Sequence, residues 1–297
     1  MTRASRTTIT GSRTTPGLLT LALTFAAMLA FAGNSLLCRV ALRDTGIDAA
    51  SFTSIRVVSG ALTLWLLVRV RGASGGAAGN WPSAAALFAY AACFSYAYIG
   101  LPAATGALLL FGAVQATMIG YGLWAGERLA RRQVVGLACA LGGLIGLLFP
   151  GISAPPALGS GLMLAAGIAW GIYSLRGKAV GDPTSVTAGN FLRAVPAAVA
   201  LSLATIPWVS LDTAGILFAI ASGALASGIG YAVWYAALRG LKATSAATVQ
   251  LSVPVIAALA GVAFLAEPIT LRLAVTSAAI LGGIAMVIVD IQPRRAD

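Results

Sequence analysis

Histidine is absent from this chain of 297 residues, and only 9% of its residues are charged. The lack of histidine excludes an imidazole proton relay and a histidine-based metal site. Soluble domains are about 25% charged, so the shortage of charge excludes an ordinary soluble fold. Only three cysteines are present, Cys38, Cys93 and Cys139, and all lie within or at the end of apolar stretches. Their odd number and their positions do not indicate a disulfide framework.

Hydrophobic residues, by contrast, make up 59% of the chain, and the mean hydropathy is +0.92. They form runs of about twenty residues, the length that an α-helix needs to cross a bilayer. The alternating ten-residue segments of a membrane barrel are not seen. We therefore predict an all-α integral membrane protein with ten transmembrane helices. The predicted spans are 17–38, 50–70, 82–101, 104–125, 132–149, 158–177, 187–207, 213–237, 243–265 and 271–290.

The basic residues lie singly or in pairs between the apolar runs, and their distribution predicts the topology. If the N-terminus is cytoplasmic, fourteen of the nineteen Lys and Arg residues fall on the cytoplasmic side, and only Arg39, Arg43 and Arg272 fall in loops on the other. This bias follows the positive-inside rule, so we expect both termini in the cytoplasm and the protein in the bacterial inner membrane. The charges form no basic face, so the net charge of +11 does not indicate nucleic-acid binding.

The two halves of the chain resemble each other at an offset of about 137 residues. The matches are Arg39 with Arg176, Arg56 with Arg193, Tyr98 with Tyr235 and, at an offset of 140, Glu127 with Glu267. We therefore divide the chain into an N-terminal tail (1–16), a first five-helix repeat (17–149), a linker (150–157), a second five-helix repeat (158–290) and a C-terminal tail (291–297). Because five is odd, the second repeat enters the membrane from the opposite side, which is the inverted-repeat architecture of secondary transporters.

Arg56 and Arg193 each lie early in the second span of a repeat. A long basic side chain near the end of a span can extend to the membrane interface. We interpret both first as interfacial anchors, with Arg56 near the outer interface and Arg193 near the inner one. The alternative interpretation is that they line or gate a transport path.

The segments that follow spans four and nine carry a family resemblance. They read LWAGERL (123–129) and FLAEPIT (264–270), and residues 244–268 read TSAATVQLSVPVIAALAGVAFLAEP. With ten spans in two halves, this pattern resembles the EamA-type members of the drug/metabolite transporter (DMT) superfamily. The first half departs from it, since Gln115 stands where the second half has Pro254. The resemblance implies a transporter; some similar members export amino acids, including the aromatic amino-acid exporters of the YddG type.

A solute path needs polar and aromatic groups within the spans, and few are available. The candidate lining residues are Asn34, Tyr90, Phe94, Tyr98, Gln115, Trp170, Tyr173, Trp234 and Gln250, with Ser35, Tyr231 and Tyr235 beside them in sequence. Tyr90, Phe94 and Tyr98 recur every four residues and share one helix face. Tyr and Trp are also enriched at membrane interfaces without any solute, so interfacial anchoring is the alternative for each aromatic. Pro254 removes a backbone donor from span nine and is a candidate hinge.

The chemistry of these groups indicates the class of solute. Amides and hydroxyls suit a neutral or zwitterionic solute, and aromatic rings can hold an ammonium group by cation–π contact. An anionic nucleotide sugar fits poorly, because no cation is expected at the centre. The sequence thus predicts an exporter of amino acids with aromatic or neutral side chains. The alternative is a multidrug or metabolite exporter of the same fold with a more hydrophobic cavity. Intramembrane hydrolysis normally uses a Ser/Lys pair, an Asp pair or a metal site, and no span centre offers a lysine, aspartate or histidine, so we expect no enzyme.

The eight acidic residues all fall in loops, in tails or at span ends. Proton-driven transporters commonly titrate a carboxylate or histidine inside the membrane, so facilitated transport or a less obvious coupling is favoured. Glu127 and Glu267 are the candidates for coupling, but we expect each to be a helix-end anchor paired with a nearby arginine. No cofactor or metal is expected, and the protein is expected to act as a monomer or a weak homodimer.

Overall fold

The computed structural model describes residues 17–72, 78–126, 128–151, 154–177, 182–241 and 249–289, and the regular elements within these ranges are all helices. The first half contains α1 (Leu18–Asp44), α2 (Ala49–Val70), α3 (Trp81–Tyr98), α4 (Ala103–Trp124) and α5 (Arg131–Leu148). The second half contains α6 (Ala157–Arg176), α7 (Pro183–Ala204), the short η2 (Ile206–Trp208), α8 (Thr213–Ala221), η3 (Ser222–Ile229), α9 (Gly230–Leu238), α11 (Ser252–Leu265) and α12 (Leu271–Val289).

These helices follow the predicted spans closely. Eight helical segments are long and apolar enough to cross a membrane, including the continuous segment Thr213–Leu238 formed by α8, η3 and α9. The helix α11 is apolar but shorter, and the part of predicted span nine before Val249 lies outside the described residues. The helix α3 is long enough but less apolar, since it carries three tyrosines and two serines. An all-helical multi-pass membrane fold is therefore confirmed.

One boundary differs in a way that matters for function. The helix α1 extends to Asp44, six residues past the predicted end of span one at 38. Arg39 and Arg43 were expected in a loop but lie in the last two turns of α1. Their side chains are thereby held in a fixed direction at the end of the bundle.

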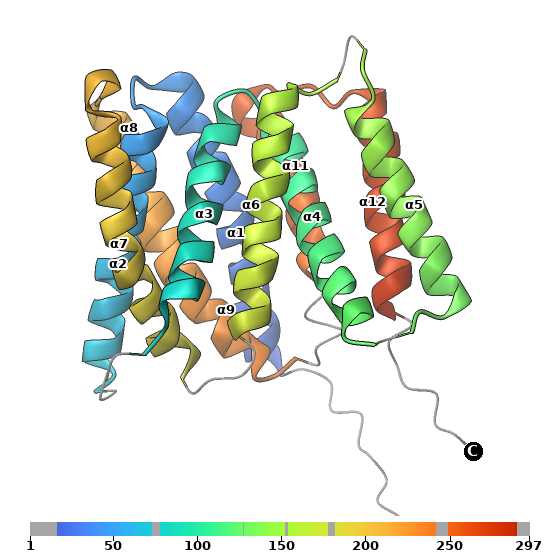
Figure 1. Ribbon diagram of the computed structural model, residues 1–297, viewed down its shortest axis with the longest axis horizontal. Helices are drawn as coiled ribbons and strands as arrows, with labels where there is room; N and C mark the ends of the chain where they lie inside the picture. Colours follow the sequence, from blue (N-terminus) through green and yellow to red (C-terminus); the bar gives the residue numbers. More distant parts are fainter. Residues whose placement is uncertain are drawn as a thin grey trace, which may run out of the picture.

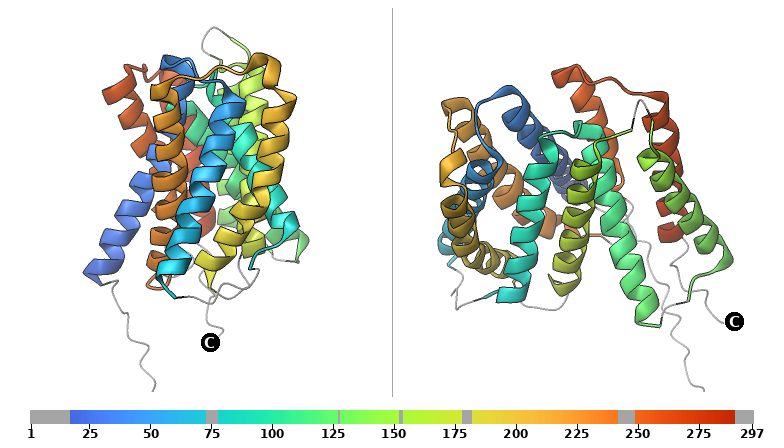
Figure 2. Two further views of the ribbon diagram at one scale, coloured as in Figure 1. Left: turned by 90° about the vertical axis from the view of Figure 1, so that its left-hand side faces the viewer. Right: turned by 45° about the horizontal axis from the view of Figure 1, so that its top comes forward.

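The helices run side by side and cross the molecule in alternating directions (Figure 1). The helix α2 packs against α7, α3 and α4 pack against α6, and α1 packs against α9 and α11. The helices α5 and α12 pack mainly against each other and form one side of the molecule, at the right of Figure 1. Figure 2 shows from a second direction that α1 begins at the same end of the bundle where α12 finishes.

Polar residues between the apolar runs start several of these helices. Asp48, Asn80, Asp182 and Asp212 are the N-caps of α2, α3, α7 and α8, and each accepts a hydrogen bond from a backbone N–H three residues on. A side-chain oxygen at this position satisfies one of the N–H groups that a helix start leaves unpaired. Three acidic residues of the chain therefore serve helix initiation.

Glycines allow α5 and α12 to approach closely. A Cβ on Gly136 would lie 2.6 Å from the carbonyl oxygen of Gly283, and a Cβ on Gly143 would lie 2.9 Å from Ala279. In a membrane, small residues of this kind let two helix backbones pack in contact. Gly142 and Gly282, one residue away, face open space.

The segment η3 is a π-helix of eight residues in the middle of a membrane crossing. Its glycines face the neighbouring helices: a Cβ on Gly228 would lie 3.1 Å from Thr63 of α2, and Gly223 packs against the backbone of Arg56. The wider turn changes the helical register between α8 and α9. Such π-turns inside α-helices are frequent at functional sites.

Candidate solute-binding site

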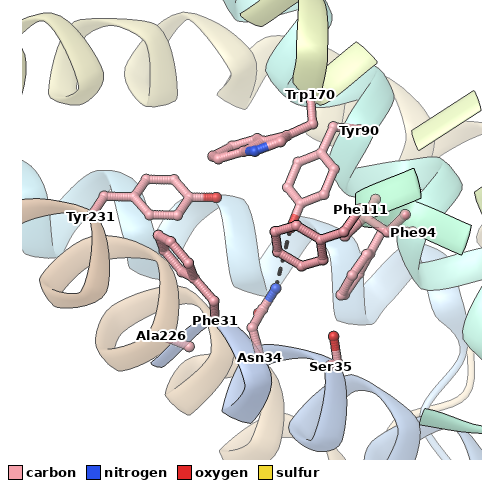
Figure 3. Close-up of a pocket in the computed structure, with 10 residues that line it drawn as sticks. Phe31, Asn34, Ser35, Tyr90, Phe94, Phe111, Trp170, Ala226 and Tyr231 are labelled. Atoms are coloured by element: carbon pink, nitrogen blue, oxygen red, sulfur yellow. Dashed lines mark hydrogen bonds between the residues drawn. The ribbon is translucent and has the colours of Figure 1, made fainter. Parts of the chain in front are cut away.

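A small cavity lies at the centre of the bundle, where helices from both halves of the chain meet (Figure 3). Its volume is about 20 Å³, room for one or two water molecules. A solute larger than water can enter only if the surrounding rings or helices move apart. The lining residues come from α1, α3, α4, α6, η3 and α9, and they are Phe31, Asn34, Ser35, Tyr90, Phe94, Leu110, Phe111, Trp170, Ala226 and Tyr231.

The polar part of the cavity is centred on the hydroxyl of Tyr90. That oxygen accepts hydrogen bonds from Asn34 Nδ2 at 3.2 Å and from Arg56 Nη2 at 2.9 Å. Asn34 Oδ1 in turn accepts from Ser222 Oγ at 2.7 Å. We call these four residues, Asn34, Arg56, Tyr90 and Ser222, the Tyr90 cluster. It joins α1, α2, α3 and η3 in one hydrogen-bonded network.

Arg56 is 2% exposed and directs its guanidinium group towards α3. The carbon Cζ lies 5.1 Å from the centre of the Tyr90 ring and 4.8 Å from that of Phe94, within cation–π range. The interpretation of Arg56 as an interfacial anchor is therefore wrong, because its side chain is buried and contacts residues inside the bundle. The expectation that no cation lies at the centre is wrong for the same reason.

Aromatic rings form the rest of the wall. The Trp170 ring lies 4.8 Å from that of Tyr90 and 5.1 Å from that of Tyr231, between ring centres. Phe31 packs edge-on against Tyr231 at 5.9 Å. In Figure 3, Trp170 lies on the opposite side of the cavity from Asn34 and Ser35. The cavity thus has a polar side and an aromatic side, and the rings can contact apolar groups or an ammonium group.

The structure brings four of the nine predicted lining residues to the cavity: Asn34, Tyr90, Phe94 and Trp170. Ser35 and Tyr231, named beside them, also line it. Three others are buried one ring further out, since Tyr98 packs on Phe94, Tyr173 packs on Trp170 and Trp234 packs on Phe31. Phe31, Leu110, Phe111 and Ala226 were missed. Of these, only Phe31 had a signal, because it lies one helical turn before Asn34.

Gln115 is not at the central cavity, although it was expected there. It is buried and lines a separate cavity between α4, α5 and α12, together with Ala116, Leu144 and Ile280. Gln250 is half-buried just before α11 and does not line the central cavity. Pro254 occupies the first turn of α11, where a missing N–H breaks no helical hydrogen bond. Its role as a hinge stays a prediction.

An ion-pair cluster holds together the end of the bundle where α1 finishes. Glu267 is 8% exposed; its Oε1 lies 3.0 Å from Arg39 Nε, and its Oε2 accepts from the N–H of Ala103 at 2.8 Å. Arg39 also donates to the carbonyls of Tyr98 and Ile99. The expected pairing of Glu267 with an arginine is confirmed, but the partner comes from the other half of the chain. Glu127 lies outside the described residues.

Hydrogen bonds to uncharged acceptors connect the halves at the opposite end. Arg193 Nη1 donates to the carbonyls of Ala78 at 2.6 Å and Gly189 at 3.0 Å. Asn190 Oδ1 accepts from the N–H of Asn80 at 2.9 Å, and Arg176 Nε donates to Ser83 Oγ at 3.2 Å. These hydrogen bonds tie the start of α3 to α6 and α7.

Two aspartates join the loop before α2 to the loop before α8. Asp48 exchanges hydrogen bonds with Ser210, and Asp212 accepts from the N–H groups of Gly215 at 2.6 Å and Gly46 at 2.5 Å. These backbone donors hold the pKa of Asp212 below its usual value. Partial burial opposes the effect at Asp48, but hydrogen bonds from Ser51 and Ser210 still lower its pKa. Both carboxylates are therefore charged at neutral pH and act as structural acceptors.

No group of three potential metal ligands occurs among the residues that the structure describes. What the central site offers instead is one buried cation, a hydroxyl, an amide and a set of aromatic rings. These groups suit non-covalent binding of a small organic molecule.

Comparison with known proteins supports this picture of the chain. Residues 157–289 match the EamA-like transporter family. An uncharacterized protein of Pseudomonas aeruginosa is 58% identical over 270 residues, which cover 91% of this chain and 94% of that protein. A protein of known crystal structure, 19% identical, covers 92% of this chain and 98% of its own with a TM-score of 0.63, a likeness that shows the fold. The chain is therefore a multi-pass membrane protein that belongs to the EamA-like transporter family.

Proposed function

We propose that this protein is a secondary transporter of the bacterial inner membrane that exports an amino acid with an aromatic or neutral side chain. The observation that carries the proposal is the central cavity, which is lined by residues of both halves and has a polar side and an aromatic side. A zwitterion with an apolar side chain can use both sides of such a site. Membership of a transporter family supports transport of a small molecule, and the polar and aromatic residues of the cavity support this solute class.

Alternating access between two inverted repeats is the mechanism we propose. The helix contacts support it, because they are preserved when the halves are exchanged: α6 packs on α3 and α4, just as α1 packs on α9 and α11. The helices α2 and α7, and α5 and α12, occupy corresponding places and pack on each other. Rocking of one half against the other would open the contracted cavity to each side in turn.

The topology can be tested with single cysteines in a variant lacking Cys38, Cys93 and Cys139. We expect Arg71→Cys to react with an impermeant maleimide only from the cytoplasmic side and Ser210→Cys only from the periplasmic side. Labelling of both positions from the same side would contradict the proposed crossings, and the reversed pattern would contradict the cytoplasmic termini.

Counterflow tests the solute. Liposomes that contain the purified protein and unlabelled phenylalanine should transiently accumulate labelled phenylalanine from outside. Liposomes loaded with tryptophan, threonine or methionine instead should also drive this uptake, each to a different extent. If none of these amino acids exchanges, the amino-acid assignment is wrong. Most of the lining is apolar, as shown by Phe31, Leu110 and Phe111. That feature favours a multidrug or metabolite exporter as the second candidate, and exchange of lipophilic cations without amino acids would identify it.

A further inference from the structure

We propose that the Tyr90 cluster is the receptor for a carboxylate on the transported solute, with Arg56 as the countercharge. The inference rests on the proposed transport function and narrows its solute class to molecules that carry one carboxylate. Molecules of similar shape without a carboxylate, including simple amines, are then poor solutes.

The first reason is an uncompensated charge. Arg56 is almost fully buried in the membrane-spanning part of the bundle, and none of the described carboxylates lies within ion-pair distance of it. A buried charge without a partner is costly, and arginines inside membrane proteins normally pair or mark a solute path. The faces of Tyr90 and Phe94 offset part of this cost. An anionic ligand group would complete the compensation.

The second reason is a surplus of donors. Arg56 Nη1 is buried and has no hydrogen-bond partner. The Tyr90 oxygen already accepts from Asn34 and from Arg56 Nη2, so its own proton has no acceptor among the described residues. The Tyr90 cluster therefore has two donors without an acceptor, Arg56 Nη1 and the O–H of Tyr90. A carboxylate has two oxygens that can accept these hydrogen bonds. Hydrogen bonds to ionised groups are about twice as strong as neutral ones.

The position of the cluster explains how the rest of the solute is held. The lining residues Tyr90 and Phe94 both contact Arg56, whose guanidinium group lies against their rings and donates to the hydroxyl of Tyr90. The Tyr90 hydroxyl thus links the cavity to the buried charge. Trp170 and Tyr231 on the other side can contact an aromatic side chain or the ammonium group. Since a single cation is present in this cluster, a solute with one negative charge fits better than a dianion.

Wild-type protein provides the primary test, so that no variant has to fold. Binding of L-phenylalanine, 3-phenylpropionate, L-phenylalaninamide and phenethylamine is measured by quenching of tryptophan fluorescence in detergent. We expect the two carboxylates to bind at least about tenfold more tightly than the amide and the amine, the ratio that one charge-assisted contact supplies. Equal or tighter binding of the amide or amine would overturn the inference, as would displacement of phenylalanine by chloride at matched concentration.

Substitutions within the Tyr90 cluster test whether it causes the preference for carboxylates. Arg56→Gln and Tyr90→Phe should lower the ratio of phenylalanine to phenylalaninamide exchange by about tenfold or more, and Arg56→Lys should restore part of it. Arg193→Gln, at the corresponding position of the other half, should leave this ratio unchanged. Because the readout is a ratio, a loss of folded protein does not mimic it. An unchanged ratio in folded Arg56→Gln protein would exclude Arg56 as the countercharge.

The outcomes separate this inference from the proposed function. If phenylalanine and phenylalaninamide exchange equally well, amino-acid transport stands and carboxylate recognition fails. If no amino acid exchanges but 3-phenylpropionate binds with the expected preference, the carboxylate receptor stands and the amino-acid assignment fails.

Discussion

Arg56 and Arg193 occupy corresponding places in the two halves of the sequence but have opposite surroundings. Arg56 is buried, stacks on two aromatic rings and donates to the hydroxyl of Tyr90. Arg193 is half-buried and donates to backbone carbonyls of Ala78 and Gly189 at one end of the bundle. Arg56 contacts residues that line the cavity, whereas Arg193, midway along α7, contacts the backbone of its own helix and of the segment before α3. A repeated position in the sequence thus does not carry a repeated role.

The scaffold around the two arginines is nevertheless alike. Asp48 caps α2 through the N–H of Ser51, and Asp182 caps α7 through the N–H of Ser185. The backbone features of the two halves therefore correspond, whereas the side chains that face the solute do not. Rocking of one half against the other requires similar helix packing in both halves. Binding of a small asymmetric solute requires only one polar site, so only one of the two arginines needs to face it.

The largest difference is expected between Arg39 and Arg176, another corresponding pair. Arg39→Gln removes the closer ion-pair partner of the buried Glu267 carboxylate and leaves only Arg43 Nη1, 4.0 Å away. Breaking a buried pair costs about 3–5 kcal/mol. Arg176→Gln removes hydrogen bonds to the uncharged side chains of Ser83 and Asn80, one part-buried and one exposed, and leaves no buried carboxylate without a partner, so its loss should be smaller. Thermal unfolding of both variants in detergent measures the difference. Equal losses would show that the ion pair of Arg39 contributes no more to stability than the hydrogen bonds of Arg176.

Arg56 and Arg193 themselves should differ in the sign of their effect on stability. A buried charge without an ion-pair partner carries a desolvation cost that an apolar side chain of similar size does not have. Arg56→Met should therefore unfold at the same or a higher temperature than the wild type while losing phenylalanine exchange. Arg193→Met should lower the unfolding temperature, because it removes two hydrogen bonds to backbone carbonyls.

A lower unfolding temperature for Arg56→Met would show instead that Arg56 stabilises the protein without any solute. The matched Arg193→Met variant controls for the loss of a positive charge in general. Opposite signs in the two variants would mean that Arg56 is retained for binding at the expense of stability, as is common for functional sites.

Most of the transmembrane helices could be predicted from the sequence, because apolar runs long enough to cross a membrane are a strong signal. The predicted start of span two at residue 50 is one residue from the start of α2 at Ala49. Asn34, Tyr90, Phe94 and Trp170 were found by asking which polar and aromatic groups interrupt apolar helices. That reasoning works because such groups avoid lipid.

The direction in which a side chain points was much harder to predict. Lipid and protein interior are both apolar, so a membrane helix does not show its inward face by periodicity as a soluble helix does. Arg56 could thus be assigned to the interface when it faces the core, and Gln115 could be assigned to the wrong cavity. The π-helix η3 was also missed; the spacing of Gly223 and Gly228, five residues apart, was its only signal.

Gly136 and Gly283 allow a test of the correspondence between α5 and α12. A Cβ on Gly136 would lie 2.6 Å from the Gly283 carbonyl, and one on Gly283 would lie 2.6 Å from the backbone N of Ala140. Overpacking of this kind costs about 1–3 kcal/mol, so Gly136→Ala and Gly283→Ala should lower stability by similar amounts. Gly282→Ala faces open space and should be neutral or stabilising by about 0.5–1 kcal/mol. Unfolding temperatures would measure all three, and clearly unequal losses at 136 and 283 would contradict the correspondence.

Asp212 should give the smallest effect, one that depends on pH. Its pKa is lowered in the folded protein by the N–H groups of Gly215 and Gly46. Its contribution to stability is therefore complete above the unfolded carboxyl pKa of about 3.9 and is lost as the pH falls through the lower folded value. Asp212→Asn keeps a side-chain oxygen that can cap α8 but has no titrating group. Its unfolding temperature should therefore fall less steeply than that of the wild type when the pH is lowered from 5 to 3.

The matched variant for this test is Asp182→Asn, because Asp182 caps α7 within its own segment and Asp212 also bonds Gly46 of the other half. In both variants the unfolding temperature should fall less steeply than in the wild type between pH 5 and 3. Only Asp212→Asn should also weaken the contact between the two loops, seen as faster hydrogen exchange at the N–H of Gly46. An unchanged exchange rate there would mean that the loops are held together by the bonds between Asp48 and Ser210 alone.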